Sequence, residues 1–401
     1  MGLRGHLFVG AIGRMDRPVY SAAMPAPLDS VRAQLDALDR RARLRRLPPR
    51  AGHDFASNDY LGFARDPAIA QAVAQAVARG VPAGSGGSRL LRGNAPEHEA
   101  LEAQAAAIFG SEAALFLANG FAANVTLLAA LPGPDDLIVA DALIHASAHD
   151  GMKASRAHAV LTPHNDADAV ADAIAVWRRA GGRGRPWIVA ETLYSMDGDR
   201  APVDALAAIA DRHEAMLVLD EAHATAVHGP AGRGLAAHLE GRANVIALHT
   251  CGKGLGVEGA LVTAARPIVD LLVNRGRAFI YSTAPSPLIA VAVSAALDLM
   301  LAADDRRAAL VALVDHAGRH LCAPLGLPTP ASQILPVPIG ADARTMQVAA
   351  AVQAAGFDVR GIRPPTVPRG TARLRVSLTL NVDAATIEAL GAALARALEG
   401  E

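Results

Sequence analysis

Lysine is almost absent from this chain. Only Lys153 and Lys253 occur among 401 residues, and arginine supplies the other 36 basic side chains. A guanidinium can replace an ammonium as a surface charge, but it cannot lose a proton and become an amine nucleophile. Lys253 is flanked by glycines at positions 252, 254 and 256, which allow close approach of backbone or ligand. This segment alone is equally compatible with a Schiff-base enzyme and with a compositional remnant on a surface loop.

Cysteines, aromatic residues and long apolar runs are scarce as well, and the net charge is close to zero. The two cysteines, Cys251 and Cys322, cannot form a disulfide framework, which predicts a reducing cytoplasm. With a net charge of −1, the chain has no excess of positive charge that would attract nucleic acid or an anionic membrane. No apolar run approaches the roughly 18 residues that a membrane span needs. With 52% hydrophobic and 19% charged residues, the composition is typical of a globular enzyme.

Residues 1–54 are predicted to form an N-terminal segment that carries a basic helix and precedes the large domain. Residues 1–24 combine a short apolar stretch with arginines that follow it. A secretory signal has its charges on the other side, so we expect a disordered extension or a start site placed upstream of Met24. Residues 40–46 form the one basic cluster, which we expect on a helix.

Two domains are predicted after this segment. Residues 55–285 are expected to form a large domain and residues 286–401 a smaller α+β domain. The second begins with a long alanine-rich helix over residues 285–303. Within it, residues 374–379 alternate like a half-exposed strand.

Short apolar runs that end in polar residues alternate with helical spacing in the middle of the chain. Such runs are typical of parallel strands that are buried on both faces. The pattern therefore predicts an α/β fold with a mostly parallel, doubly wound sheet. In this fold the residues just past the carboxyl ends of the strands line the ligand crevice. The runs are residues 135–140, 187–190, 216–219 and 245–248, and the polar residues after the last three are Glu191, Asp220 to His223, and Thr250 to Lys253.

These polar residues include groups that pyridoxal 5′-phosphate (PLP) requires. This cofactor needs an amine for a Schiff base, a carboxylate at its pyridine nitrogen, a group over its ring and a cradle for its phosphate. Lys253 offers the amine and Asp220 the carboxylate, which would keep the ring nitrogen protonated. The alternative for Asp220 is the N-cap of a helix. His145 and His223 are candidates to face the ring, and each has the alternative of a satisfied core histidine.

A phosphate cradle is predicted at Gly120 and Phe121, which precede the helical pattern of residues 122–130. Exposed amides at a helix N-terminus favour an anion, and Thr250 can add a hydroxyl. The glycine-rich residues 84–89 look superficially like a dinucleotide loop, but no strand precedes them.

Other chemistries are disfavoured. The cysteines are far apart, and no His-x-x-x-His pair carries a glutamate in the manner of a zinc site, so no metal site is expected. The motif Gly-x-Ser-x-Gly, which carries the nucleophilic serine of α/β-hydrolases, is absent, so the sequence offers no candidate for that kind of hydrolase. Lys153 is predicted to be a dispensable surface residue.

Several motifs together resemble the α-oxoamine synthases from about residue 30 to the C-terminus. This family consists of fold-type I, PLP-dependent homodimers, and residues 362–375 (IRPPTVPRGTARLR) look most like its biotin-pathway branch. The other matching motifs are FASNDYLG at 55–62, GSGGSR at 84–89, NGFAAN at 119–124, YSMDGD at 194–199 and DEAH at 220–223.

The resemblance implies a role for each matching residue. Lys253 would carry the cofactor, Asp220 would pair with the ring nitrogen, and His145 would stack on the ring as the third catalytic residue. Asn58 and Arg363 would receive the substrate carboxylate. The other expected cofactor contacts are Gly120, Phe121, Ser195, His223 and Thr250, and the other expected substrate contacts are Thr366 and, for the acyl substrate, Arg45 in the basic N-terminal helix.

The implied reaction is decarboxylative condensation of L-alanine with a pimeloyl thioester of coenzyme A or an acyl-carrier protein. Two residues depart from the family pattern: Asn119 replaces a common serine, and Arg92 lies in a glycine-rich substrate loop. The nearest rival is another member such as glycine C-acetyltransferase. A transcription regulator with an aminotransferase-like domain is a rival from another class, but the roughly 50 residues before the fold are too few for a DNA-binding module. An inactive homologue is disfavoured because every catalytic position is filled.

Overall fold

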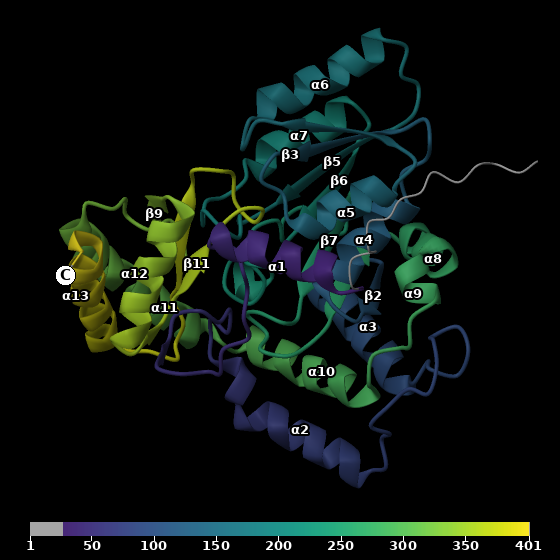
Figure 1. The fold of residues 1–401 in the computed structure, drawn as a ribbon. Coiled ribbons are helices and arrows are strands. Elements are labelled where there is room, and N and C mark those ends of the chain that lie inside the picture. The colour runs from purple at the N-terminus through teal and green to yellow at the C-terminus, as the bar shows by residue number, and fades with distance from the viewer. Residues whose placement is uncertain (1–26, 401) are drawn as a thin grey trace, which may run out of the picture. The chain divides into compact units, whose positions relative to one another are not determined.

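The computed structural model describes residues 27–400. A seven-stranded sheet lies at its centre (Figure 1). Its strand order is β2-β8-β7-β6-β5-β3-β4. Strands β4, β3, β5, β6 and β7 pair in parallel, whereas β8 runs antiparallel to both β7 and β2. The bounds are β2 Ala113–Leu117, β3 Leu137–Asp141, β4 His158–Thr162, β5 Pro186–Glu191, β6 Met216–Asp220, β7 Val245–Thr250 and β8 Ala260–Ala264. The predicted α/β fold with a mostly parallel sheet is therefore confirmed.

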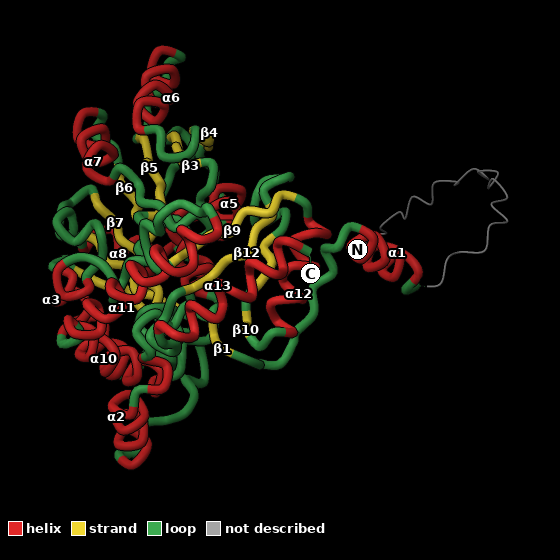
Figure 2. Tube along the Cα trace, turned by 90° about the vertical axis from the view of Figure 1, so that its left-hand side faces the viewer, coloured by secondary structure: helices red, strands yellow, loops and turns green. Residues whose placement is uncertain are grey.

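Helices cover both faces of this sheet because its strands are apolar on both sides. Along β3, Ile138 and Ala140 pack into one core cluster, whereas Leu137 and Val139 pack into another. The first cluster lies under α4 (Gly120–Ala130), α5 (Ala146–Ala154), α8 (Arg266–Arg275) and α9 (Arg277–Ile280). The second lies under α6 (Ala167–Arg179) and α7 (Val203–Arg212), which stand beside β3, β5 and β6 in Figure 2.

A third apolar cluster extends the second face toward β2 and β8. It contains side chains of α3 (Pro96–Phe109) and α10 (Pro287–Leu301), and Ile69 of α2 (Pro67–Ala78) packs against it. The helix expected over residues 285–303 thus forms as α10. In the described part of the chain no single helix has the length and apolar character to span a membrane. The bent pair α10 and 304–325 meets that test only when both halves are counted together.

A smaller antiparallel sheet of order β11-β12-β9 follows in the C-terminal part. It consists of β9 (Ile334–Gly340), β11 (Arg360–Ile362) and β12 (Ala372–Ser377) and packs with α11 (Asp304–Ala317), α12 (Asp342–Ala354) and α13 (Ala384–Glu399). The short strands β1 (His53–Asp54) and β10 (Phe357–Asp358) pair in parallel. The expectation of a half-exposed strand here was wrong, because all six residues of β12 are buried.

In the described part of the chain, residues 27–46 form one unit and residues 47–400 form the other. In the first unit α1 spans Asp29–Arg40, so only the first residue of the basic cluster 40–46 is helical. The prediction of Arg45 on a basic helix was therefore wrong: the backbone leaves the helix at Arg41 and Ala42 adopts a positive φ. Residues 1–24 lie outside the described part, and the domain boundary expected at residue 285 stays a prediction.

Candidate active site

Lys253 lies in the turn between β7 and β8, and the glycines beside it permit close backbone contacts. A Cβ on Gly254 would lie 2.4 Å from the carbonyl oxygen of Thr225, and a Cβ on Gly256 would lie 2.3 Å from the amide nitrogen of Ala64. Gly256 also has a φ of +66°, which side-chain-bearing residues rarely adopt. The glycine-rich sequence is thus required by the packing that positions the lysine.

The amine of Lys253 faces a buried histidine. Its Nζ lies 2.9 Å from Nε2 of His223, whose Nδ1 lies 2.6 Å from the hydroxyl of Tyr60. Burial lowers the pKa of Lys253 to about 8, although the carboxylates of Asp220 and Glu191 act in the opposite direction. Burial and the neighbouring lysine also hold the pKa of His223 well below its usual value. A neutral imidazole beside a weakly basic amine is an arrangement suited to proton transfer.

Asp220 ends β6 and lies buried near this amine. Its Oδ2 accepts a hydrogen bond of 2.7 Å from Nδ2 of Asn124, and its Oδ1 accepts one from the amide of Ala222. Asn124 also donates to Ser147, and sequence reasoning assigned it no role. Residues 221–228 form turns and no helix, so the N-cap alternative for Asp220 does not hold.

Glu191, at the end of β5, is the neighbour of Asp220, and the sequence predicts for it only a place in the ligand crevice. The two residues are register partners, so two carboxyl groups lie side by side at the edge of the sheet. Oε2 of Glu191 accepts a hydrogen bond from the amide of Ser195, whereas Oε1 is buried without a hydrogen-bond partner among residues 27–400. Burial, assisted by Asp220, raises the pKa of Glu191 to about 8.

The predicted phosphate cradle lies at the N-terminus of α4. Asn119 caps this helix by accepting a hydrogen bond of 2.8 Å from the amide of Ala122. The hydroxyl of Thr250 lies against the helix start: a Cβ on Gly120 would be 3.1 Å from its Oγ1. The side chain of Phe121 is 49% exposed. Amides of the first helical turn, together with this hydroxyl, suit a phosphate group.

His145 lines a cavity of about 470 Å³. It caps α5, where Nδ1 lies 2.7 Å from Oγ of Ser147, and burial lowers its pKa. The loop at 195–197 and the proline-rich segment 365–368 line the same cavity. The other lining residues include Ser195, Met196, Asp197, Pro365 and Thr366.

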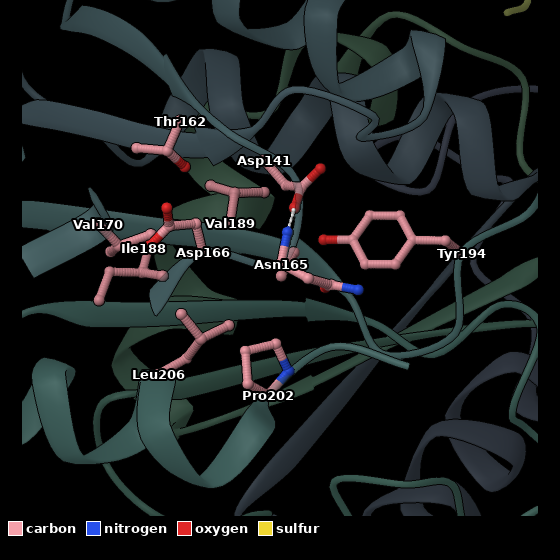
Figure 3. Close-up of a pocket in the computed structure, with 11 residues that line it drawn as sticks. Asp141, Thr162, Asn165, Asp166, Val170, Ile188, Val189, Tyr194, Pro202 and Leu206 are labelled. Carbon is pink, nitrogen blue, oxygen red and sulfur yellow. Dashed lines mark hydrogen bonds between the residues drawn. The ribbon is translucent and has the colours of Figure 1, made fainter. Parts of the chain in front are cut away.

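Asp141, at the end of β3, anchors the loop that leads to His145 by accepting a hydrogen bond of 2.7 Å from the amide of Leu143. It accepts hydrogen bonds from the amide of Asn165 and from Nδ1 of His164, at 2.7 and 2.9 Å. Figure 3 shows Asn165 and the ring of Tyr194 converging on this carboxylate. Hydrogen bonds to Asp141 and Asp199 on both sides outweigh burial and raise the pKa of His164.

Arg375 is a buried cation that sequence reasoning did not select. Its guanidinium donates hydrogen bonds to the carbonyl of Ser195, to Oδ1 of Asn58 and to Oγ of Ser377, at 2.6, 3.0 and 2.8 Å. Tyr60 accepts a longer one. Within the described residues no carboxylate pairs with Arg375. A signal was present in the sequence, because arginines at 373 and 375 interrupt an otherwise apolar strand.

The remaining predicted residues lie in less enclosed places. Arg363 follows β11 and is half-buried, whereas Arg45 is exposed in the N-terminal unit and Arg92 is exposed in its loop. The side chain of Lys153 is 78% exposed and pairs with Asp150, as expected of a surface residue. The donor set around Lys253 fits PLP: an amine, a buried carboxylate, a helix N-terminus against a hydroxyl, and a cavity beside them.

Comparison with known proteins agrees with this site. Residues 52–394 match the model of the family described as aminotransferase class I and II. The 8-amino-7-oxononanoate synthase of Anaeromyxobacter dehalogenans strain 2CP-1 is 43% identical over 387 residues, which cover 92% of this chain and 96% of the relative. The chain belongs to the family of 8-amino-7-oxononanoate synthases.

Solved structures share the fold. The 8-amino-7-oxononanoate synthase of Francisella tularensis superposes with a TM-score of 0.73 at 26% identity and covers 87% of this chain and 98% of its own. A serine palmitoyltransferase of S. paucimobilis, solved with PLP and myriocin bound, gives a TM-score of 0.83 at 24% identity over 92% of this chain and 97% of its own. The second likeness supports the fold alone.

Proposed function

We propose that this enzyme condenses L-alanine with a pimeloyl thioester and releases carbon dioxide, which yields 8-amino-7-oxononanoate for biotin biosynthesis. It is a PLP-dependent acyltransferase. The observation that carries the proposal is the position of Lys253 at the carboxyl edge of a parallel sheet. Its Nζ lies 2.9 Å from Nε2 of His223, and its charge interacts with the carboxylate of Asp220. Relatives more than 40% identical carry the same activity in their names.

The proposed cofactor contacts divide among three elements. Asp220 would pair with the ring nitrogen, and His145 would cover the ring. The first amides of α4 at Gly120 and Phe121, with the hydroxyl of Thr250, would hold the phosphate, and Ser195 and His223 would face the phenolic side. When bound, PLP supplies an electron sink that stabilises a carbanion at the alanine Cα.

Proton transfer is assigned to Lys253. Because its pKa is lowered to about 8, about a tenth of the amine is uncharged at pH 7, far more than for an ordinary lysine, and this form can take the Cα proton of alanine. His223 is held neutral by burial, so it can accept a hydrogen bond from Nζ without competing as a cation.

The alanine carboxylate is proposed to bind between Asn58 and Arg375. A buried guanidinium with only neutral hydrogen-bond acceptors is a site prepared for an anion. Arg363, expected in this role from the family resemblance, stays a second candidate on the same segment. Thr366, which lines the cavity with His145, is proposed to lie beside the substrate, and Arg45 is proposed to meet the acyl group.

A homodimer in the cytoplasm is part of the proposal. Large apolar side chains are exposed at the start of α4, just after α9, which packs against α4, and in the loop 84–93, whose Arg89 lies over the ring of Phe279 in α9; this supports a subunit contact. They are Leu90, Leu91, Phe121 and Tyr281. Both cysteines are free and buried, which supports a reducing compartment.

Substituting Lys253→Ala tests the assignment directly. The variant should lose turnover and the visible absorbance of the cofactor bound to its lysine, whereas Lys153→Ala should keep both. Assays that combine alanine, glycine and serine with pimeloyl and acetyl thioesters of coenzyme A and of acyl-carrier protein would separate the proposed reaction from that of glycine C-acetyltransferase. Retained turnover in Lys253→Ala would refute the proposal.

A further inference from the structure

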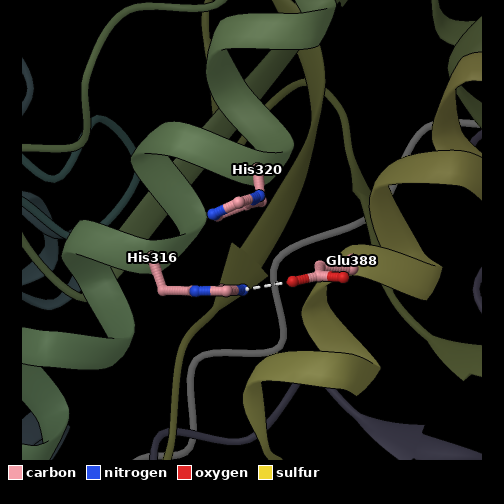
Figure 4. A group of neighbouring side chains, drawn as sticks. All are labelled: His316, His320 and Glu388. Atoms are coloured by element: carbon pink, nitrogen blue, oxygen red, sulfur yellow. Dashed lines mark ion pairs between the residues drawn. The ribbon is translucent and has the colours of Figure 1, made fainter.

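Two histidines and a glutamate converge in the C-terminal part of the molecule (Figure 4). His316 lies in the last turn of α11, His320 in the following π-helical turn Gly318–Cys322, and Glu388 in α13. Each offers one possible ligand atom, and these atoms all lie within 4.8 Å of one another. The cluster is separate from the residues assigned to the condensation.

The helix geometry brings the two imidazoles together. Residues four apart lie on the same face of a helix, and the rings of His316 and His320 stack with centroids 4.2 Å apart and planes 23° apart. The π-helical turn that carries His320 is a rare conformation that occurs frequently at functional sites. None of the catalytic contacts described above accounts for it.

The contact between His316 and Glu388 is close but is not a hydrogen bond. Nε2 of His316 lies 3.0 Å from Oε1 of Glu388, yet this buried nitrogen has no hydrogen-bond partner within residues 27–400. In the tetrahedral geometry that zinc prefers, two donors that each bind the ion at about 2.1 Å lie about 3.4 Å apart. The observed separation of 3.0 Å is close to this edge of a tetrahedral shell, so a small movement of either side chain would let both atoms bind one ion.

We propose that His316, His320 and Glu388 form a binding site for a divalent transition-metal ion of the zinc type. Two imidazoles and a carboxylate are a common ligand set for zinc, and water would complete the shell because His320 and Glu388 are exposed. A bound ion would tie the end of α11 to α13. Sequence reasoning excluded a metal because it required the glutamate next to the histidine pair, whereas Glu388 comes from another helix.

Zinc binding to the untagged full-length holoenzyme tests this proposal. Equilibrium dialysis with elemental analysis should find one zinc ion per chain at micromolar free zinc. His316→Ala, His320→Ala and Glu388→Gln should each weaken binding at least tenfold. His238→Ala is the matched control, because His238 also faces a carboxylate, that of Asp204 at 2.7 Å, but has no second imidazole in the described part of the chain.

Thermal unfolding provides the second readout. An ion that binds only the folded chain raises its melting temperature, so zinc should stabilise the wild type and His238→Ala but not His320→Ala. Unchanged visible absorbance of the cofactor would show that each variant is folded. The proposal is overturned if the wild type binds no stoichiometric zinc at micromolar free zinc, or if the three site variants bind it as tightly as the wild type.

Discussion

Arg375 places a positive charge in a buried site where its hydrogen-bond partners among residues 27–400 are all neutral. Replacing it by methionine should raise the KM for alanine by about 10- to 100-fold, because a charge-assisted hydrogen bond contributes about 1.5–3 kcal/mol. Steady-state kinetics at saturating thioester measure the change, and Arg375→Lys should recover part of it. Cofactor absorbance should be retained in both.

The matched control for this prediction is Arg363→Met. If Arg363→Met raises the KM for alanine and Arg375→Met does not, the family-based assignment of the carboxylate to Arg363 is correct and the assignment to Arg375 is wrong.

Glu191 should make the cofactor-free enzyme less stable as the pH rises. Its pKa is raised from 4.5 to about 8 in the folded state, so between these values the folded chain binds a proton that the unfolded chain has lost. Stability then decreases with rising pH across this window. Glu191→Gln should remove the decrease, which melting temperatures between pH 5 and 8 would show. Glu399→Gln, at an exposed position of α13, should keep the wild-type dependence. An identical pH profile in Glu191→Gln would contradict the assignment.

The turn that carries Lys253 depends on Gly254 and Gly256, which follow the lysine in the sequence. Gly256→Ala should destabilise the enzyme and displace the lysine, because the new Cβ would lie 2.3 Å from the backbone of Ala64 at a positive φ. We expect a loss of more than about 2 kcal/mol of unfolding free energy together with reduced cofactor affinity. Gly252→Ala is the control, since its Cβ would meet nothing closer than 3.6 Å. Equal effects of the two substitutions on denaturant unfolding would show that the close contact is not decisive.

The strands differ in how far the sequence alone could predict them. Residues 187–190, 216–219 and 245–248 are short, apolar and followed by polar groups, and each forms a strand of the sheet that ends at the site. The pattern of residues 374–379 indicated a half-exposed strand because polar residues alternate with apolar ones. In the structure the polar side is buried too, because Arg375 faces Asn58 and Ser195 rather than water. Alternating polar and apolar residues indicate that one face of a strand has polar surroundings. Those surroundings can be a buried polar site as well as water.

The small sheet and the large sheet build the active site jointly. Gln333, just before β9, donates to the carbonyl of His223, and Ser332 donates to that of Gly198. The loop after β5 is therefore held from the C-terminal side. These contacts join residues more than a hundred positions apart, so neither periodicity nor local motifs could predict them. The proximity of Lys253 and Asp220, by contrast, could be predicted, because the carboxyl ends of neighbouring parallel strands meet at one edge of the sheet.

Asp197 and Arg373 form an ion pair across the same junction. Because Arg373 lies on β12 two residues before Arg375, and Asp197 two residues after Ser195, this pair fixes the spacing between the strand and the loop that Arg375 binds. Asp197→Asn and Arg373→Gln should each lower kcat/KM for alanine about 5- to 30-fold, as expected for a coupling of about 1–2 kcal/mol between groups in contact. The double variant should fall no further than either single one, since each change already breaks the pair. Strictly additive losses in this cycle would show that the two side chains act independently, and the loop would then be positioned by Arg375 and Ser332 alone.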